Sequence, residues 1–427
     1  MKNLIKVIKP YIVCLFIGII IGTIVGLYEF VMKYIQLIST NLYSNQNIIN
    51  IIIIVICTLL FSIANYFIIK LCPQIDGSGV PMLELGIRNL RPINYKFDVI
   101  GMIVNSYISS FVGFPLGSEG PSVVISGKLS KLVCDLTKTD SNDIVPIASG
   151  IGFGCAFLSP LSGFIYIFEE MLHQFNFKIL LHAIFIILGA FCTTFFINKH
   201  HLLNLNTLLI PTFDTFYILI FITIANVLVG FLFVKFIIIL KDYFNKHKGS
   251  IFVKYRGFLY FIIIMILNFF LLKYMGSGGS IMGSNIISNS LIIASSIFLL
   301  RFILTIISGT GSVTGGLVVP TMTIGYLVGQ IIGVIFNKTL NFSTNYIQIY
   351  SLISACMLFA IVTKTPLTAS SLLLSTILRL SNYNILTTFK ITLLPIVFIF
   401  ISLYLYKFFK LENLYDEQIK LILKNYK

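Results

Sequence analysis

The sequence predicts an all-α, polytopic integral membrane protein. Hydrophobic residues make up 57% of the 427 residues and charged residues only 11%, whereas about a quarter of the residues in a soluble domain are charged. The mean hydropathy is +0.97, and the chain has room for roughly a dozen or more helical segments that cross or partly cross a bilayer. Glycine and proline interrupt many of the apolar runs, which indicates tilted and broken helices.

The net charge of +15 is best explained by membrane topology. Basic residues cluster at the ends of apolar runs, as the positive-inside rule predicts, so nucleic acid is not an expected partner. The lysine excess lies in the N-terminus, in a loop expected at 241–256 and in the C-terminal tail. We therefore expect a multi-pass protein of the cell membrane with both termini in the cytoplasm.

The first apolar run, from about Tyr11 to Ile38, predicts a spanning helix that is retained. It is longer than the hydrophobic region of a signal peptide and no small-residue cleavage site follows it. Its glycines at 18, 22 and 26 form a notch suited to helix packing. Later apolar segments are expected at about 48–72, from 97 to the 116–122 stretch, and at 122–136. A further helix is expected to end at 169–171, and apolar segments follow at 179–197, at 213–240 and in several runs that end near 409.

The stretch Leu116–Ser122 places a carboxylate, Glu119, between two glycines and next to Pro121. An acid at membrane depth is costly and by default marks an ion or proton pathway. Pro121 suits the first turn of a helix, and helix N-termini present N–H groups to anions. Glu119 could instead be a structural acid that satisfies those N–H groups. In either case, we expect a helix to begin at this carboxylate.

An internal repeat follows from three breaks that occur in the same order in both halves. Gly77-Ser78-Gly79 precedes Pro121 by 44 residues, counted from Gly77, and Gly276-Ser277-Gly278 precedes Pro320 by the same 44. The third pair of breaks is Ser159-Pro160-Leu161-Ser162 and Thr365-Pro366-Leu367-Thr368. Matched breaks in two halves point to a transport site at the repeat interface. We expect one membrane domain, 1–427, with a first repeat at about 11–200, a second at about 213–409 and a C-terminal segment at 410–427.

Other classes of site have little support in the sequence. The seven cysteines are scattered and mostly lie in apolar runs, and the five histidines show no metal-ligand spacing. A phosphate-binding loop ending in Lys-Ser/Thr is absent. We therefore expect no metal, no cofactor, no nucleotide and no enzymatic activity. A membrane-embedded transferase or a structural subunit would need a catalytic cluster or a partner-binding soluble domain, and neither is evident.

These motifs resemble the family of CLC chloride channels and proton-coupled chloride transporters. Gly77-Ser78-Gly79-Val80-Pro81, Gly117-Ser118-Glu119-Gly120-Pro121 and Gly316-Leu317-Val318-Val319-Pro320 are similar to its three anion-site motifs, in order. Pro160-Leu161-Ser162-Gly163 with Glu169-Glu170-Met171 is similar to its proton-glutamate helix, and Leu414-Tyr415 to its terminal tyrosine. The resemblance implies a homodimer in which each subunit has its own pore and two inverted-topology repeats.

The resemblance also assigns roles to individual residues. Glu119 is expected to be the gate and, with Glu170, part of the proton pathway. Ser78 could otherwise only fill a turn, Tyr415 could be an interfacial anchor and Glu170 an ordinary charged helix end. The expected anion-binding residues are Ser78, Ser118, Gly120, Leu317, Val318 and Tyr415.

Several positions depart from the family pattern. Ser118 replaces a basic residue before the gate, and Val318 replaces a phenylalanine whose contribution is its backbone N–H. Met102 stands where many members have a buried lysine, and Ser375 where the second half usually has a glutamate. The chain ends soon after Tyr415, so we expect no paired cytoplasmic regulatory domain.

The function expected from these features is chloride/proton antiport. The alternative within the same fold is a passive, voltage-dependent chloride channel, which is favoured if Glu170 has no role. Proton exchange needs titratable groups near both faces, because one gate carboxylate cannot carry protons across roughly 30 Å of membrane. Glu119 and Glu170 are the candidates for these two groups.

We predict that Ser78→Pro raises nitrate transport relative to chloride transport. The change removes a hydroxyl donor that favours the compact chloride ion, and nitrate-preferring members of the resembled family carry proline here. The measurement is the reversal potential, or the flux ratio, in mixed chloride and nitrate gradients. An unchanged ratio would remove Ser78 from the anion site.

Overall fold

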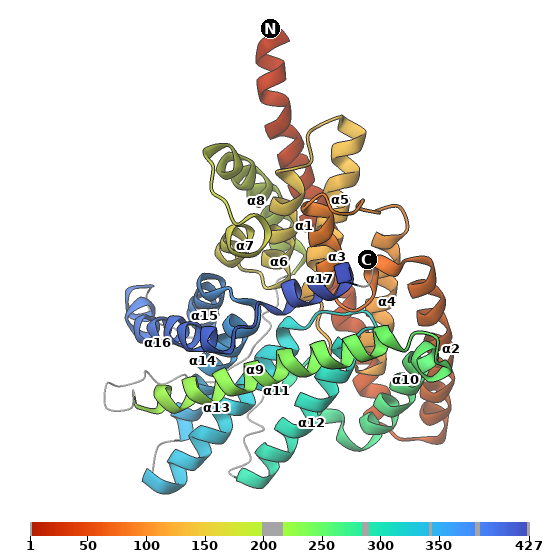
Figure 1. Ribbon diagram of the computed structural model, residues 1–427, viewed down its shortest axis with the longest axis vertical. Coiled ribbons are helices and arrows are strands. Elements are labelled where there is room, and N and C mark those ends of the chain that lie inside the picture. Colours follow the sequence, from red (N-terminus) through yellow and green to blue (C-terminus); the bar gives the residue numbers. More distant parts are fainter. Residues whose placement is uncertain (1, 199–216, 284–289, 341–343, 381–384, 425–427) are drawn as a thin grey trace. The chain divides into compact units, whose positions relative to one another are not determined.

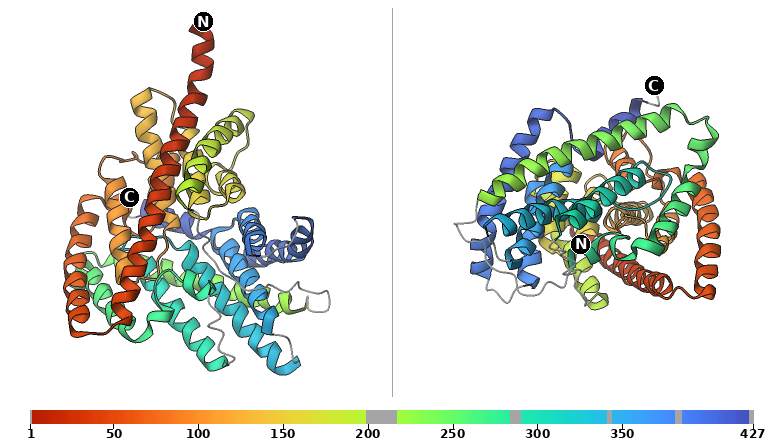
Figure 2. Two further views of the ribbon diagram at one scale, coloured as in Figure 1. Left: turned by 180° about the vertical axis from the view of Figure 1, so that it is seen from behind. Right: turned by 90° about the horizontal axis from the view of Figure 1, so that it is seen from below.

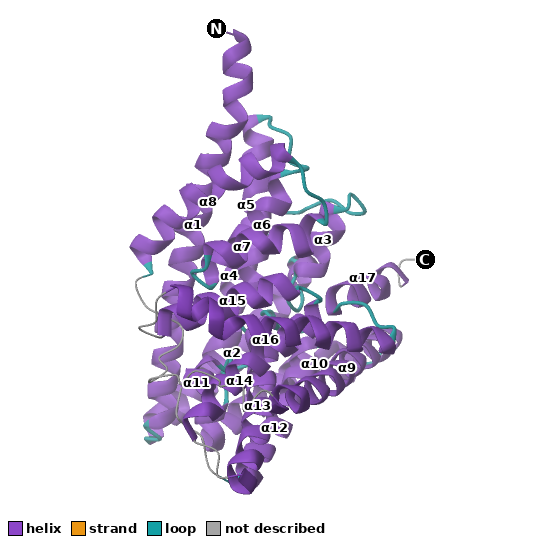
Figure 3. Cartoon of the chain, turned by 90° about the vertical axis from the view of Figure 1, so that its left-hand side faces the viewer, coloured by secondary structure: helices purple, strands orange, loops and turns teal. Residues whose placement is uncertain are grey.

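The computed structural model describes residues 2–198, 217–283, 290–340, 344–380 and 385–424. Every extended regular element in these ranges is a helix (Figure 1, Figure 3). Nine helical segments of this described part are long and apolar enough to cross a membrane, judged by length and composition. The predictions of an all-α fold and of several membrane-crossing helices are therefore confirmed.

The chain divides into two compact units. Unit 1 is Met1–His200, Gly249–Leu272 and Gly311–Gly316, and unit 2 is His201–Lys248, Lys273–Thr310 and Leu317–Lys427. The expected repeats were defined from sequence motifs, whereas units 1 and 2 are defined by packing. The boundaries of the repeats and of the units are therefore separate quantities. The expected boundary between the repeats, at 200–213, lies outside the described residues.

Unit 1 holds the first eight α-helices and α10. Gly113, at φ +85°, ends α4, and Ser159 caps α7 through its side chain. The bounds are α1 Lys2–Ser44, α2 Ile48–Leu71, η1 Pro73–Ile75, α3 Val80–Ile87, α4 Asp98–Val112, α5 Glu119–Thr137, α6 Ile144–Ala156, α7 Pro160–Tyr166, η2 Ile167–Leu172, α8 Phe177–Ile197 and α10 Ile251–Leu271.

Unit 2 is organised around α14, whose residues from Ile347 to Thr363 are all buried. Gly325 and Gly329 of α13 lie against the backbone of α14, where a Cβ atom would collide. The bounds are α9 Tyr217–Lys246, η4 Leu272–Tyr274, α11 Gly279–Gly283, α12 Leu291–Gly309, α13 Val318–Leu340, α14 Thr344–Thr363, α15 Pro366–Leu380, α16 Ile385–Tyr406, η5 Lys407–Phe409 and α17 Leu414–Lys424.

The glycine notch of α1 is where α8 packs. A Cβ atom at Gly18 would overlap the carbonyl oxygen of Ile186, and one at Gly22 would overlap that of Ala190. Figure 2 shows the two helices running side by side over much of their length. Small residues permit this close backbone contact, which replaces the hydrophobic driving force that is missing inside a bilayer.

The loop expected at 241–256 is mostly helical, so this expectation was wrong. Helix α9 continues to Lys246 and α10 begins at Ile251, which leaves a connection of only four residues. Lys246 forms an ion pair of 2.6 Å with Asp242, one turn earlier in α9. Such i,i+4 pairs stabilise exposed helix ends. The lysines of this segment suggested a loop, although some of them lie in helices.

Candidate functional site

The gate candidate Glu119 begins helix α5, as the motif predicted. Its side chain is only 4% exposed. The carboxylate folds back over Gly117. Its Oε2 atom lies so close that a Cβ atom at Gly117 would collide with it. The positive end of the helix dipole and the first N–H groups of α5 stabilise a negative charge at this position.

Ser78 lies in a glycine turn that leads directly into α3. Gly77 and Gly79 have φ angles of +70° and +69°, a conformation that side chains disfavour. Ser78 itself is 6% exposed. Met102, which is fully buried, packs against Gly79, where a Cβ atom would lie 2.6 Å from the Cε atom of Met102. The methionine at the position of the missing lysine therefore fills space beside the Ser78 turn.

Main-chain hydrogen bonds within unit 1 join the predicted motifs. Gly117 and Gly316 exchange N–H···O bonds of 2.8 and 2.7 Å. Gly77 donates to Val313 at 3.1 Å and accepts from Gly315 at 2.9 Å. Three motifs that are far apart in the sequence thus meet through their backbones, at Gly77, Gly117 and Gly316.

Glycine is required where these backbones are closest. A Cβ atom at Gly120 would lie 2.9 Å from the Cα atom of Gly316, which is inside the range that real contacts avoid. The carboxylate of Asp76 accepts a 2.5 Å hydrogen bond from the backbone N–H of Ser312 and so closes the same loop. Glycine at positions 120 and 316 therefore meets a steric requirement.

The remaining anion-site candidates belong to unit 2. Leu317 and Val318, at the start of α13, are 3% and 4% exposed, and Tyr415 is 1% exposed. Tyr415 lies in the first turn of α17, where the sequence predicted a polar tail. Asn413 caps this turn by accepting a 2.6 Å hydrogen bond from the N–H of Asp416. The helical tail thus holds Tyr415 in a defined, buried position.

Ser375, the other departure in the second half, has its hydroxyl engaged locally. It donates to the carbonyl oxygen of Leu372 at 3.0 Å within α15. The serine hydroxyl therefore bonds to its own helix turn, at the position where the family resemblance led us to expect a glutamate.

Glu170 lies in a short π-helix that continues α7. This segment, η2 Ile167–Leu172, also contains Glu169. Glu170 is 2% exposed and Glu169 is partly exposed. Wide π-turns occur mostly as single turns and are common at functional sites. The two adjacent acids therefore differ in exposure.

Glu84 is a buried acid with a partner at the end of its own helix. It is 3% exposed on α3, and Arg88, one turn later, donates to its carboxylate at 3.1 Å. The spacing of four residues was the available signal.

Glu29 is a further residue that the sequence analysis missed. It lies on α1, and its two carboxylate oxygens accept hydrogen bonds from Ser118 Oγ at 2.9 Å and from Ser122 Oγ at 3.1 Å. The available signal was an acid inside the first apolar run. Because the Ser118 hydroxyl is bound to Glu29, the backbone N–H is the group of Ser118 that remains a candidate for anion binding.

A buried ion pair fixes the middle of α5. Lys128, with no exposed surface, forms an ion pair with Asp98 at the start of α4 and donates to the Oε1 atom of Gln74 at 3.1 Å. Burying two charges is costly unless they are paired and hydrogen-bonded. This pair joins the gate helix to α4 and to η1, which precedes the Ser78 turn.

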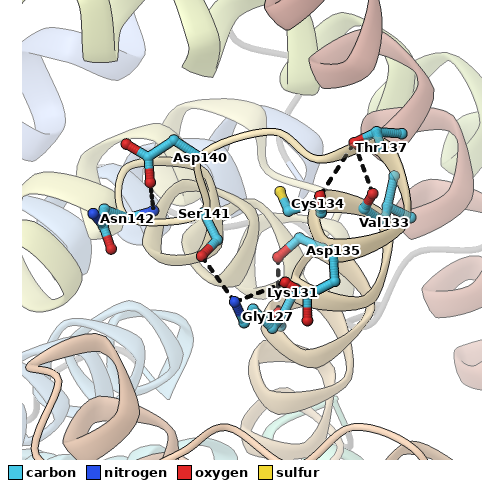
Figure 4. Close-up of polar contacts among 10 residues, drawn as sticks. Gly127, Lys131, Val133, Cys134, Asp135, Thr137, Asp140, Ser141 and Asn142 are labelled. Atoms are coloured by element: carbon cyan, nitrogen blue, oxygen red, sulfur yellow. Dashed lines mark hydrogen bonds and ion pairs between the residues drawn. The ribbon is translucent and has the colours of Figure 1, made fainter.

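The far end of α5 carries polar contacts of another kind (Figure 4). Lys131 donates to Asp135 at 2.8 Å and to Ser141 at 3.1 Å. A cavity of about 310 Å³ beside Lys131 is lined by Arg91 and Asn142 among others. None of the predicted anion-site residues lines it, so this cavity is separate from the candidate site.

Lys364 brings a positive charge to the segment that carries Tyr415. It precedes α15, outside the membrane-spanning helices, and has a φ angle of +57°. Burial lowers the pKa of Lys364, and the nearby acids Glu412, Asp416 and Glu417 oppose that shift. These acids therefore help to keep the lysine charged.

Comparisons with known proteins agree with this geometry. A family model described as "Voltage gated chloride channel" matches residues 59–394. The chain is 25% identical over 284 residues to the H(+)/Cl(-) exchange transporter ClcA of Citrobacter koseri, a match that covers 64% of this chain and 60% of that protein. The same protein of Salmonella paratyphi B is 24% identical with the same coverage. The matched region thus spans 60% of the length of these relatives.

Solved structures share the fold over nearly the whole chain. A slow cyanobacterial Cl-/H+ antiporter has a TM-score of 0.85 at 18% identity, covering 97% of this chain and 98% of that one. A eukaryotic CLC transporter gives 0.79 at 13% identity, with 98% and 75% covered. A CLC-type fluoride/proton antiporter gives 0.68 at 17% identity, with 91% and 95% covered. At these identities the likeness concerns the fold alone.

We predict that Lys128→Met lowers the free energy of unfolding by about 3–5 kcal/mol, because Asp98 is left as a buried charge without its partner. The measurement is thermal unfolding in detergent. Lys131→Met is the matched control, since its partly exposed i,i+4 pair contributes about 0.3–0.5 kcal/mol. Adding Asp98→Asn should recover part of the loss. Equal effects of the two lysine variants would contradict the assignment of the pair.

Proposed function

Since the chain belongs to the voltage gated chloride channel family, we propose that it moves chloride across the membrane in exchange for protons. The observation that carries this proposal is a pair of buried carboxylates, Glu119 at the start of α5 and Glu170 in η2. A simple anion pore has no need of a second acid at membrane depth. The relatives named H(+)/Cl(-) exchange transporters support the same choice.

The proposed anion site uses hydrogen-bond donors in place of a cation. Ser78 and Tyr415 supply hydroxyl donors. Ser118, Gly120, Leu317 and Val318 supply backbone N–H groups near the starts of α5 and α13. Helix N-termini favour anions because their first N–H groups lack helical acceptors. Chloride, once stripped of water, would gain these donors in return.

Glu119 acts as the gate in this proposal. An ionised carboxylate at the start of α5 occupies the position that favours an anion, and so it excludes chloride. Chloride or a proton can displace it. A protonated, neutral Glu119 no longer gains from the helix dipole and swings away, which opens the path. A single side chain thereby links anion passage to proton uptake.

Glu170 is the proposed relay toward the opposite face. Its buried position in a π-turn, with the partly exposed Glu169 beside it, suits a group that exchanges protons between solvent and the interior. The passive chloride channel is the alternative outcome of the experiments below. In that case Glu170 would have no effect on transport.

The assembly and topology are part of the same proposal. We infer a homodimer with one pore in each subunit, and inverted repeats at about 11–200 and 213–409. Both termini are assigned to the cytoplasm, because the lysine excess at the chain ends and at the α9–α10 connection follows the positive-inside rule. The protein is assigned no enzymatic role, and its ligands are chloride and protons.

We predict that Glu119→Gln abolishes proton coupling while chloride flux persists. Glutamine mimics the protonated gate, which can neither release a proton nor take one up. The measurement is chloride efflux together with chloride-driven proton uptake in proteoliposomes that contain only this protein. Proton pumping at the wild-type rate by the variant would refute the gate assignment.

We predict that Glu170→Gln eliminates proton movement and leaves chloride conduction in place, because the proton path loses its second titratable group. Glu169→Gln, one residue away and partly exposed, is the matched control and should retain coupled exchange. The same proteoliposome assay reports both fluxes. If Glu170→Gln moved protons as fast as wild type, another route would carry them and Glu170 would be excluded.

A further inference from the structure

Two carboxylates share the start of helix α5. Glu119 is its first residue, and Glu29 of α1 binds the hydroxyls of Ser118 and Ser122, which flank Glu119 in the sequence. Ser118 and Ser122 are four residues apart and therefore lie on one face of the helix. Glu29 is thus fastened to the first turn of the helix that the gate begins.

Glu29 also lies at one end of a row of polar residues on α1. The row continues through Lys33, Gln36 and Thr40, at spacings of four, three and four residues. These spacings place all four side chains on one face of the helix. Thr40 lies near the end of α1, which is at Ser44. Glu119, beside the other end of the row, is buried, with 4% of its surface exposed. We call this row, from Glu29 to Thr40, the polar row.

Helix α4 adds polar groups along the same part of α1. Gln36 donates to Ser110 Oγ at 3.2 Å, and Ser39, next to the polar row, donates to the carbonyl oxygen of Phe111 at 2.6 Å. The polar row therefore contacts α4 through Gln36, and Ser39 adds a second polar contact between the same two helices of unit 1.

The groups around Glu29 are compatible with proton exchange. Lys33 on α1 interacts electrostatically with Glu29, and so do Tyr28 on the same helix, Tyr107 on α4 and Cys155 on α6. Tyr28 also interacts with Glu119. Among the residues just named, Lys33 is the one that carries a positive charge. Its side chain is exposed, and it does not contact Glu29 closely enough to form an ion pair among the described residues.

We propose that Glu29 is a further proton-carrying residue of this protein, which takes up a proton delivered along the polar row and passes it to Glu119. This inference rests on the proposed exchange function. In the transfer, the O–H bond of the Glu29 carboxyl group breaks and an O–H bond forms on the Glu119 carboxylate. Serine hydroxyls both donate and accept, so Ser118 can relay the proton without a change in its own charge.

A purely structural role predicts something different. If Glu29 only fixed the first turn of α5 by accepting from Ser118 and Ser122, its loss would disturb the anion path whatever the state of the gate. A proton carrier matters only while the gate still needs a proton. The two roles are therefore separated by the effect of the Glu29 substitution when Glu119 is already neutral.

The test is a double-mutant cycle in proteoliposomes, with chloride efflux and chloride-driven proton uptake measured for wild type, Glu29→Gln, Glu119→Gln and the double variant. Glu29→Gln should slow coupled exchange by on the order of tenfold to a hundredfold, as expected when a positioned proton donor is lost. In the Glu119→Gln background it should leave chloride flux unchanged within about twofold, because a gate that is already neutral no longer needs a proton and the two substitutions are therefore non-additive. Glu29→Asp, which keeps the carboxylate, should restore most of the exchange.

Matched variants control for charge and for folding. Asp135→Asn neutralises an acid at the other end of α5 and should leave both fluxes at wild-type levels. Glu29→Ala removes the same charge as Glu29→Gln without introducing an amide, and it serves the cycle if the glutamine variant does not fold. Thermal unfolding in detergent identifies a variant whose loss of flux is a loss of folded protein.

Two results would overturn the inference. One is coupled exchange at the wild-type rate in both neutral variants, and the other is an equal reduction of chloride flux in the wild-type and Glu119→Gln backgrounds. Failure of the exchange function itself is distinguishable, because wild type would then pass chloride without moving protons. The chloride fluxes of the cycle would still decide whether Glu29 acts through Glu119.

Discussion

The candidate site of unit 1 depends on hydrogen bonds between main chains. Gly77 is bonded to Val313 and Gly315, and Gly117 to Gly316. Each bond fixes a loop directly before Ser78 or before Glu119, and so sets where the following helix begins. Glycine is needed at Gly316, where the backbone of Gly120 lies too close for a Cβ atom, and at Gly77, whose φ angle of +70° is disfavoured for side chains.

Three acids inside unit 1 illustrate a second constraint, because each of them is held by a different kind of group. Asp98 has the ion pair with Lys128, Glu84 has Arg88, and Glu29 has two serine hydroxyls. An ion pair fixes a charge, since removing either partner leaves the other uncompensated. A hydroxyl places less constraint on the charge of a carboxylate, because it can donate to the ionised form and accept from the protonated form. This difference separates structural acids from acids that can exchange protons.

Much of the fold was predictable. The apolar composition indicates membrane-crossing helices, and the glycine spacing indicates where backbones come close together. The helix start at Glu119 followed from local chemistry that needs no tertiary information. The contacts of Glu29 were not predictable, since its partners are about ninety residues away in the sequence. The helical structure of 241–246 was missed because lysines were counted as loop residues, although the Asp242 and Lys246 spacing indicated a helix turn. The roles of the anion-site residues remain predictions.

The π-turn that carries Glu170 also limits how this segment can change in length. A π-turn is equivalent to one extra residue inserted into an α-helix. Deleting one residue from Ile167–Leu172 would let the segment relax to a regular α-helix. Each residue of an α-helix corresponds to about 100° of rotation, so the deletion would turn the acid toward a different neighbour. Insertions and deletions in η2 would therefore redirect Glu170.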